Sequence, residues 1–218
     1  MTDVPWSEVA SISLLTLRVT LTATCLGTLV GVPIGAALGL RAKPSASLFR
    51  IVLYTLYSLP PVIAGLFGYI LLRRDGWLGS FHLLFTPAAI VIVEFFLTAP
   101  LIAGLTIAAL TEVPRSVREA VLASGAGPAR RQWTLVKEAR FGIVAAIMVG
   151  MGRSLAEVAG ALLVGGNVRG ETRTLGTAIL QEISQGDFDF ALTLGYVLLA
   201  LAFVSVLALA WVQSRNAG

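Results

Sequence analysis

The sequence predicts an all-α membrane protein with five transmembrane helices, its N-terminus outside and its C-terminus in the cytoplasm. Composition gives the first indication. Apolar residues make up 56% of the 218 residues, charged residues only 13%, and the mean hydropathy is +0.86. A soluble domain of this size needs a more highly charged surface, so the membrane class follows. The lengths of the apolar segments and the charges of the loops give the number of spans and their orientation.

Five apolar segments are long enough to cross a hydrocarbon core of about 30 Å. They cover approximately residues 13–40, 48–72, 86–110, 142–165 and 189–212. Each is far longer than the roughly 10 residues of a barrel strand, and none alternates in a sustained way, so strands are not expected. No internal repeat and no low-complexity linker interrupts the chain, and residues 1–218 are therefore predicted to form a single membrane domain.

The Lys and Arg residues of the loops predict the orientation, since cytoplasmic loops carry an excess of them. Ten lie on one side of the predicted spans: Arg41, Lys43, Arg50, Arg115, Arg118, Arg130, Arg131, Lys137, Arg140 and Arg215. Four lie on the other side: Arg73, Arg74, Arg169 and Arg173. The bias places the C-terminus in the cytoplasm and the N-terminus outside, as an odd number of spans requires.

The first predicted span carries glycines at four-residue spacing: Gly27, Gly31, Gly35 and Gly39. Residues with this spacing share one helix face, where the lack of side chains lets another backbone approach closely. We expect this stripe to pack against a neighbouring span. The first ten residues include Asp3 and Glu8 but no Lys or Arg, which is unlike the basic start of a cleaved signal peptide, so we expect this span to be retained.

Four charged residues lie within predicted spans: Arg18, Glu94, Arg153 and Glu157. Charges at that depth are costly and usually face a bundle interior or a wet path, so we expect a neutral buried network. Arg153 and Glu157 are four residues apart on one predicted helix and are expected to pair. Two interpretations remain open: the charges only hold spans together, or Arg153 borders a path for an anion.

The loop of about residues 114–141 is polar and is predicted to form two short helices. Pro114 ends the preceding span, and Ser116 with Glu119 has the spacing of a capping box. Gly125 or Gly127 can end the first helix in a left-handed conformation, and Pro128 can begin the second. Such hairpins occur in many membrane proteins, so this local chemistry does not by itself decide between a connection and a docking surface.

Two further segments are predicted to lie at the membrane surfaces. Outside, Thr174 can cap a short amphipathic helix whose apolar face is formed by Leu175, Ala178, Ile179 and Ile183. This helix would lie flat beneath the outer surface, and these residues alone are those of an ordinary interfacial helix. On the cytoplasmic side, the basic cluster predicts anchoring to membrane lipid; it comprises Arg130, Arg131, Lys137 and Arg140.

Several classes of site are excluded by what the chain contains. With one cysteine, Cys25, and one histidine, His82, we expect no disulfide and no metal site. Neither Lys43 nor Lys137 follows the glycines of a G-x-x-x-x-G-K-[ST] motif, so an ATP site of that kind is absent from this chain. We expect no catalytic residues, no bound cofactor and no nucleic acid partner.

Three stretches resemble a known family. Residues 118–127 read Arg-Glu-Ala-Val-Leu-Ala-Ser-Gly-Ala-Gly and resemble the Glu-Ala-Ala-x-x-x-Gly loop of ABC importer permeases, with Val121 in place of the second Ala. Residues 153–160, Arg-Ser-Leu-Ala-Glu-Val-Ala-Gly, look like a stretch of molybdate and sulfate permeases. Residues 165–174, Gly-Gly-Asn-Val-Arg-Gly-Glu-Thr-Arg-Thr, followed by Gly-Asp-Phe at 186–188, resemble tungstate permeases more closely.

The resemblance implies the permease subunit of a type I ABC importer for tungstate in a bacterial or archaeal plasma membrane. The coupling surface for a separate ATPase would then include Glu119, Ala120, Gly125 and Ala126. The translocation path or gate would include Arg153, Ser154 and Glu157, and contacts to an extracytoplasmic binding protein would include Arg169 and Arg173. A second copy of the chain would complete the path, and two ATPase subunits would bind ATP and Mg²⁺.

Three alternatives remain open at this point. A molybdate or sulfate permease differs only in substrate, which the binding protein would largely select. A secondary transporter driven by an ion gradient would need no ATPase and is typically built from inverted repeats, which the sequence does not show. A membrane scaffold would have no path at all.

Overall fold

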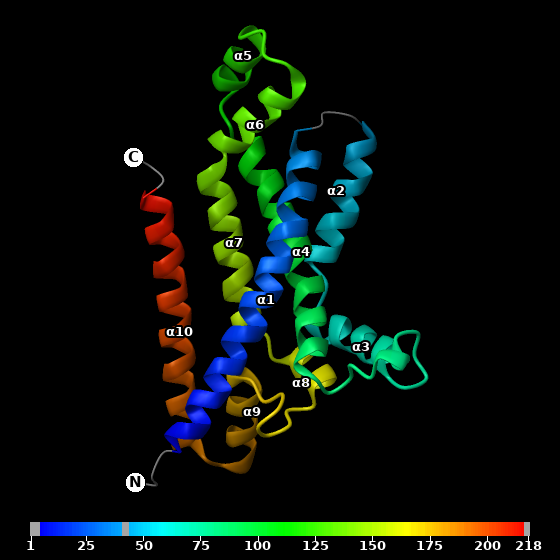
Figure 1. Ribbon diagram of the computed structural model, residues 1–218, viewed down its shortest axis with the longest axis vertical. Helices are drawn as coiled ribbons and strands as arrows, with labels where there is room; N and C mark the ends of the chain where they lie inside the picture. The colour runs from blue at the N-terminus through cyan, green and yellow to red at the C-terminus, as the bar shows by residue number, and fades with distance from the viewer. Residues whose placement is uncertain (1–4, 41–43, 216–218) are drawn as a thin grey trace.

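The computed structural model describes residues 5–40 and 44–215, and helices account for most of this part of the chain, which contains no strand (Figure 1). In chain order the helices are α1 (Trp6–Gly39), α2 (Pro44–Tyr57), α3 (Pro61–Leu72), the short 3-10 helix η1 (Gly79–Phe81), α4 (Pro87–Thr111), α5 (Arg115–Ala123), α6 (Pro128–Glu138), α7 (Arg140–Leu155), α8 (Ala159–Gly165), α9 (Leu175–Gln185) and α10 (Phe188–Arg215). The predicted all-α fold is confirmed.

Three helices are long and apolar enough by themselves to cross a membrane: α1, α4 and, over its stretch Phe188–Ala208, α10. The other two predicted spans, 48–72 and 142–165, are each broken into two helices. The axes of α2 and α3 differ by 93°, and those of α7 and α8 by 56°. If each bent pair is one span, the number of crossings reaches the predicted five.

The break between α2 and α3 follows from two adjacent prolines. Pro60 and Pro61 remove two backbone donors, and a proline disfavours helical geometry in the residue before it, so α2 ends at Tyr57. Pro61 then serves as the first residue of α3, where its missing N–H costs nothing. As a result α3 lies across the direction of α2, as Figure 1 shows.

The glycine stripe of α1 packs against α4, as predicted. A Cβ atom built on Gly31 would lie 2.6 Å from the carbonyl oxygen of Ala99, and one on Gly35 would lie 2.5 Å from that of Ala103. Neither distance is tolerable, so only glycine permits this approach of the two backbones. This contact fixes the second half of α1 on the second half of α4.

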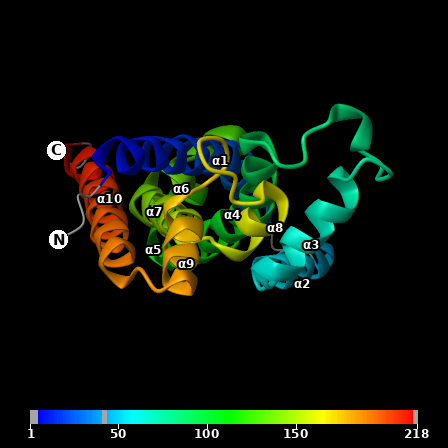
Figure 2. The same cartoon turned by 90° about the horizontal axis from the view of Figure 1, so that it is seen from below.

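The molecule has two distinct ends (Figure 1). The α5–α6 hairpin forms one end, whereas α9, the start of α1 and the start of α10 lie at the other. Seen along the bundle in Figure 2, α4 and α7 lie between α10 on one side and the α2–α3 pair on the other. The buried side chains of α4, among them Ile90, Ile102 and Ile107, form the centre of the packing.

The helix predicted to follow Thr174 is present as α9. The Thr174 side chain accepts a hydrogen bond from the backbone N–H of Thr177, and the Thr177 side chain accepts one in return from the N–H of Thr174. Leu175 and Ala178 are buried in a cluster with Val9 of α1 and with α10, whereas Ile183 is exposed. The apolar face of α9 therefore packs mainly within the protein.

Candidate functional site

The α5–α6 hairpin has the turn that the sequence predicts. Gly125 has φ +69°, the left-handed conformation that favours glycine, immediately after the last turn of α5. Pro128 is the first residue of α6. The Ser124 hydroxyl accepts from the N–H of Ala126 at 3.4 Å, and the guanidinium of Arg131 donates to the Ala126 carbonyl at 2.5 Å. The turn is thus fixed by its own residues.

The predicted capping box of Ser116 and Glu119 is wrong. The helix begins earlier, at Arg115, with Pro114 in the N-cap position and without a side-chain cap, so Ser116 already lies inside the first turn. Pro114 supplies the extended backbone that a helix start needs, with ψ 142°. Glu119 instead pairs with Arg115 at 2.8 Å on the exposed face, an interaction that contributes little to stability.

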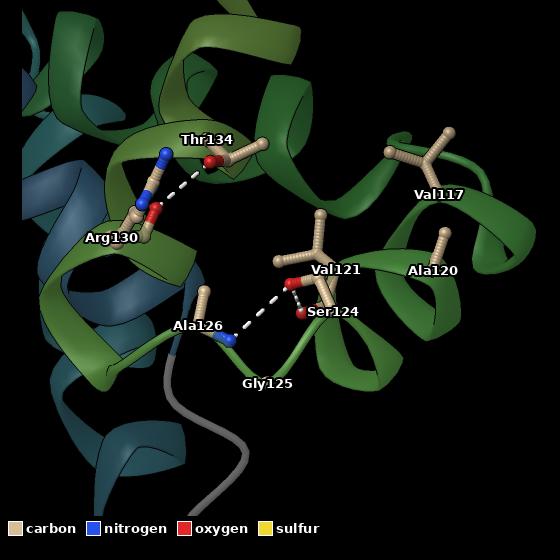
Figure 3. A pocket seen from close by; sticks show the side chains of 8 residues that line it. All are labelled: Val117, Ala120, Val121, Ser124, Gly125, Ala126, Arg130 and Thr134. Atoms are coloured by element: carbon tan, nitrogen blue, oxygen red, sulfur yellow. Dashed lines mark hydrogen bonds between the residues drawn. The ribbon is translucent and has the colours of Figure 1, made fainter.

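A hollow of about 660 Å³ opens between α5 and α6. Its lining residues, drawn in Figure 3, are Val117, Ala120, Val121, Ser124, Gly125, Ala126, Arg130 and Thr134. Neither helix has a buried residue, and Leu122 on α5 is exposed as well. Three residues of the predicted coupling surface, Ala120, Gly125 and Ala126, lie in this hollow, and Glu119 lies on the helix beside it.

The hairpin is tied to the end of α4 by Arg118. Its Nε donates to the carbonyl of Val113 at 3.2 Å, and its NH2 donates to the carbonyl of Leu110. The last carbonyls of a helix lack partners within the helix, so a guanidinium is well suited to bind them. A displacement of α5 would therefore pull directly on α4. Sequence reasoning used Arg118 only as a loop charge and missed this role.

The break between α7 and α8 carries a buried polar site. Ser154 in the last turn of α7 donates a hydrogen bond from its hydroxyl to the carboxylate of Glu94 in α4. Beyond the break, Glu157 accepts from the N–H of Gly160 at 2.8 Å and so satisfies a free donor in the first turn of α8. The exposed fractions of Glu94 and Ser154 are 3%, and that of Glu157 is 8%.

The predicted ion pair of Arg153 and Glu157 is absent from the described residues, as is the predicted network of four charges. Because α7 ends at Leu155, the two residues do not share one continuous helix face. The Nε of Arg153 is buried without a hydrogen-bond partner. Arg18 is exposed on α1 and lines a hollow with Pro87 and Arg173.

The other end of the molecule holds Arg169 and Arg173 in a second polar cluster. Both arginines bind Glu8 of α1, Arg173 at 3.3 Å, and Arg173 also lies 3.8 Å from Glu182 of α9. The side chain of Arg173 is buried, whereas that of Arg169 is 70% exposed. The hydrogen bond and the charge of Glu8 raise the pKa of Arg169, which stays cationic. Arg169 is therefore the more accessible of the two, although Arg173 lines a hollow of about 330 Å³.

No group of three or more His, Cys, Asp or Glu residues that could hold a metal ion occurs in the part of the chain that the structure describes. The polar sites described above are the α5–α6 surface, the α7–α8 break and the cluster around Glu8.

Comparison with solved structures gives the same fold. The chain matches an inward-facing MetNI methionine ABC transporter with a TM-score of 0.73, at 23% identity over 99% of this chain and 97% of the other. It also matches a bacterial ABC transporter involved in the import of the acidic polysaccharide alginate, with a TM-score of 0.61 at 17% identity, over 93% of this chain and 79% of the other. These likenesses concern the fold alone.

Comparison of sequences points to more specific relatives. The chain is 36% identical to a probable anion ABC transporter permease protein of Haloferax volcanii, over 91% of this chain and 88% of that protein. It is 34% identical to the tungstate uptake system permease protein TupB of Peptoclostridium acidaminophilum, over 90% of this chain and 86% of that protein. A family model matches residues 31–217. The chain belongs to the family of binding-protein-dependent transport system inner membrane components.

Proposed function

We propose that this chain is the membrane permease subunit of an ATP-driven oxyanion importer, and that its substrate is tungstate. The family membership supports the ABC permease role. The names of two relatives, an anion permease and a tungstate permease, support the substrate class. The rival substrates are sulfate, carried according to its name by the CysW permease of Synechocystis at 27% identity, and molybdate.

The observation that carries the proposal is the α5–α6 surface. A hollow of about 660 Å³ lies between α5 and α6, and neither helix has a buried residue. Arg118 attaches this hairpin to the end of the central helix α4. A separate ATPase docks there and contacts Glu119, Ala120, Gly125 and Ala126. ATP and Mg²⁺ bind to that partner, and its closure moves α5 and, through Arg118, α4.

The permease works as a homodimer with the translocation path between the two copies. The N-terminus lies outside and the α5–α6 end lies in the cytoplasm, which the ten-to-four distribution of Lys and Arg supports. Arg153, Ser154 and Glu157 border the path at the α7–α8 break. An extracytoplasmic binding protein delivers the oxyanion at the opposite end, where Arg169 is exposed and Arg173 supports it from within the cluster.

Transport by the purified complex tests this function. The chain is purified with the ATPase and the binding protein that accompany it, and the complex is reconstituted in proteoliposomes. We expect uptake of tungstate that requires ATP and the binding protein and that continues when ion gradients are dissipated. Uptake that an ion gradient drives without ATP would identify a secondary transporter. Titration of the binding protein with tungstate, molybdate and sulfate identifies the substrate.

A further inference from the structure

A second hollow, of about 350 Å³, lies between the end of α1 and α6, and its lining side chains are apolar apart from that of Gln132. One wall is the last part of α1, from Pro33 to Leu40, and the other carries Ala129, Gln132, Trp133 and Val136 of α6. We refer to this hollow as the α1–α6 groove. It shares no lining residue with the hollow between α5 and α6, and the residues assigned above to ATPase coupling and to the oxyanion path do not line it.

The position of the groove decides what can fill it. Its α1 wall is the end of a helix that is apolar enough to cross a membrane, and Arg41 and Lys43 follow directly in the sequence, so we place the groove near the level where hydrocarbon meets lipid headgroups. An apolar hollow of this kind is unfavourable when it is filled with water. Trp133 has an exposed fraction of 69% on this side of α6, and tryptophan is enriched at this level of a membrane.

The charges beside the groove favour an anionic headgroup. Lys137 is exposed and lies four residues after Trp133, so it adjoins the groove face of α6, whereas Arg130, three residues before Trp133, lines the hollow between α5 and α6. The helix carries three cations, Arg130, Arg131 and Lys137, against one carboxylate, Glu138. Arg140 follows at the start of α7, with its guanidinium 4.6 Å from the centre of the Phe141 ring.

We propose that the α1–α6 groove binds one anionic phospholipid, with an acyl chain between α1 and Trp133 and its phosphate beside Lys137. The proposal rests on the proposed function only for its side of the membrane, the cytoplasmic leaflet. A lipid in this groove bridges the first span and the second helix of the hairpin, so the lipid supports the position of the coupling surface.

Fluorescence of Trp133 tests the groove directly. Trp6, Trp77 and Trp211 are replaced by Phe in the full-length chain, which leaves Trp133 as the reporter, and the protein is placed in lipid nanodiscs. Brominated phosphatidylglycerol and brominated phosphatidylcholine are compared at equal mole fraction. We expect half-maximal quenching by brominated phosphatidylglycerol at a mole fraction several-fold lower than that needed with brominated phosphatidylcholine. A reporter that keeps only Trp77, which is 94% exposed near the other end, is expected to show no headgroup preference.

Two charge variants with opposite expected signs sharpen the test. Lys137→Gln should raise the phosphatidylglycerol fraction needed for half-maximal quenching about fivefold, the ratio that corresponds to about 1 kcal/mol per basic residue near an anionic surface. Glu138→Gln should lower this phosphatidylglycerol fraction, because it removes the carboxylate beside Lys137. Filling the groove with Ala37→Phe should reduce quenching by both lipids. These positions are exposed, so the variants are expected to fold.

The outcomes that overturn the proposal are distinct. Equal quenching by both lipids would show that Trp133 contacts the bilayer without a binding site for an anionic headgroup beside it. Absence of quenching would mean that a second copy or another protein covers the groove. If Trp133 shows no preference while proteoliposomes still import oxyanion, this inference fails and the proposed function stands. If Trp133 prefers phosphatidylglycerol but the complex imports no oxyanion, the lipid site stands and the proposed transport function is refuted.

Discussion

Ser154 donates a hydrogen bond to the carboxylate of Glu94 across 60 residues of sequence, and both side chains are buried. This bond holds the last turn of α7, directly before the break to α8, against the central helix α4. Among the ion pairs of the described residues none involves Glu94, so the hydroxyl of Ser154 is its specific polar partner there. The break is thus attached to the helix that Arg118 connects to the α5–α6 hairpin.

The first prediction concerns this bond. Ser154→Ala should destabilise the protein by about 1–3 kcal/mol because it leaves a buried carboxyl oxygen without its donor. Glu94→Gln should be much milder, since the amide oxygen can still accept from Ser154, whereas Glu94→Ala should cost at least as much as Ser154→Ala. Thermal unfolding in detergent measures the effect. The losses of Ser154→Ala and Glu94→Ala should be less than additive in the double variant; full additivity would show that the two side chains do not act together.

The second prediction concerns Glu157, which serves α8 and not Arg153. Glu157→Ala should cost about 0.5–2 kcal/mol, the range for loss of a side chain that accepts from the first turn of a helix. Glu157→Gln retains the accepting oxygen and should be nearly neutral. Because Arg153 and Glu157 form no ion pair, the losses of Arg153→Ala and Glu157→Ala should add. If the double variant is markedly more stable than the sum of the two single losses predicts, Arg153 and Glu157 do form an ion pair and this prediction is wrong.

The third prediction concerns the contact of α1 with α4. Gly35→Ala places a Cβ atom 2.5 Å from the carbonyl of Ala103, so the helices must separate, at a cost of about 1–3 kcal/mol. Gly195→Ala in α10 is the matched control, because a Cβ atom there meets nothing within 4 Å. Unfolding of both variants is followed in detergent. Equal stability of the two would mean that α1 does not approach α4 this closely.

The fourth prediction concerns the coupling surface. Gly125→Asp should abolish association with the ATPase while the chain remains inserted in the membrane, because it puts a charge into the hollow and disfavours the left-handed backbone. Gly186→Asp is the matched control: its φ is +84°, it also has open space, and it lies at the opposite end of the molecule. Co-purification measures association. Loss of the ATPase in both variants, or in neither, would argue against this surface.

The fifth prediction concerns orientation. In a Cys25→Ala background, which removes the exposed native thiol, single cysteines are introduced at Ser124 and Gly170. Impermeant thiol reagents should label the Gly170 position in intact cells and should reach the Ser124 position only after the membrane is opened. The two positions lie in the two opposite ends of the molecule, so labelling with the reverse pattern would invert the proposed topology.

Local chemistry in the sequence determined much of the fold. The apolar run near 86–110 became α4, with Thr86 as its cap and Pro87 as its first residue. The start of α6 at Pro128 also followed from a single residue with a narrow backbone preference, and of the two glycines predicted to end α5 the structure has Gly125 in the left-handed conformation. The four-residue spacing of glycines predicted a close helix contact. In each case the deciding interactions lie within a few residues of one another, so they can be read from the chain.

Only the tertiary structure decided which groups meet. Glu94 and Ser154 are 60 residues apart, and no local pattern links them. Spacing predicted a pair of Arg153 and Glu157, but a break after Leu155 turned the carboxylate toward the N–H of Gly160. The bonds of Arg118 to the carbonyls of Leu110 and Val113 likewise depend on how α5 packs against the end of α4. The physical reason is that backbone preferences act locally, whereas the partner of a buried polar group is chosen by the packing of the whole bundle.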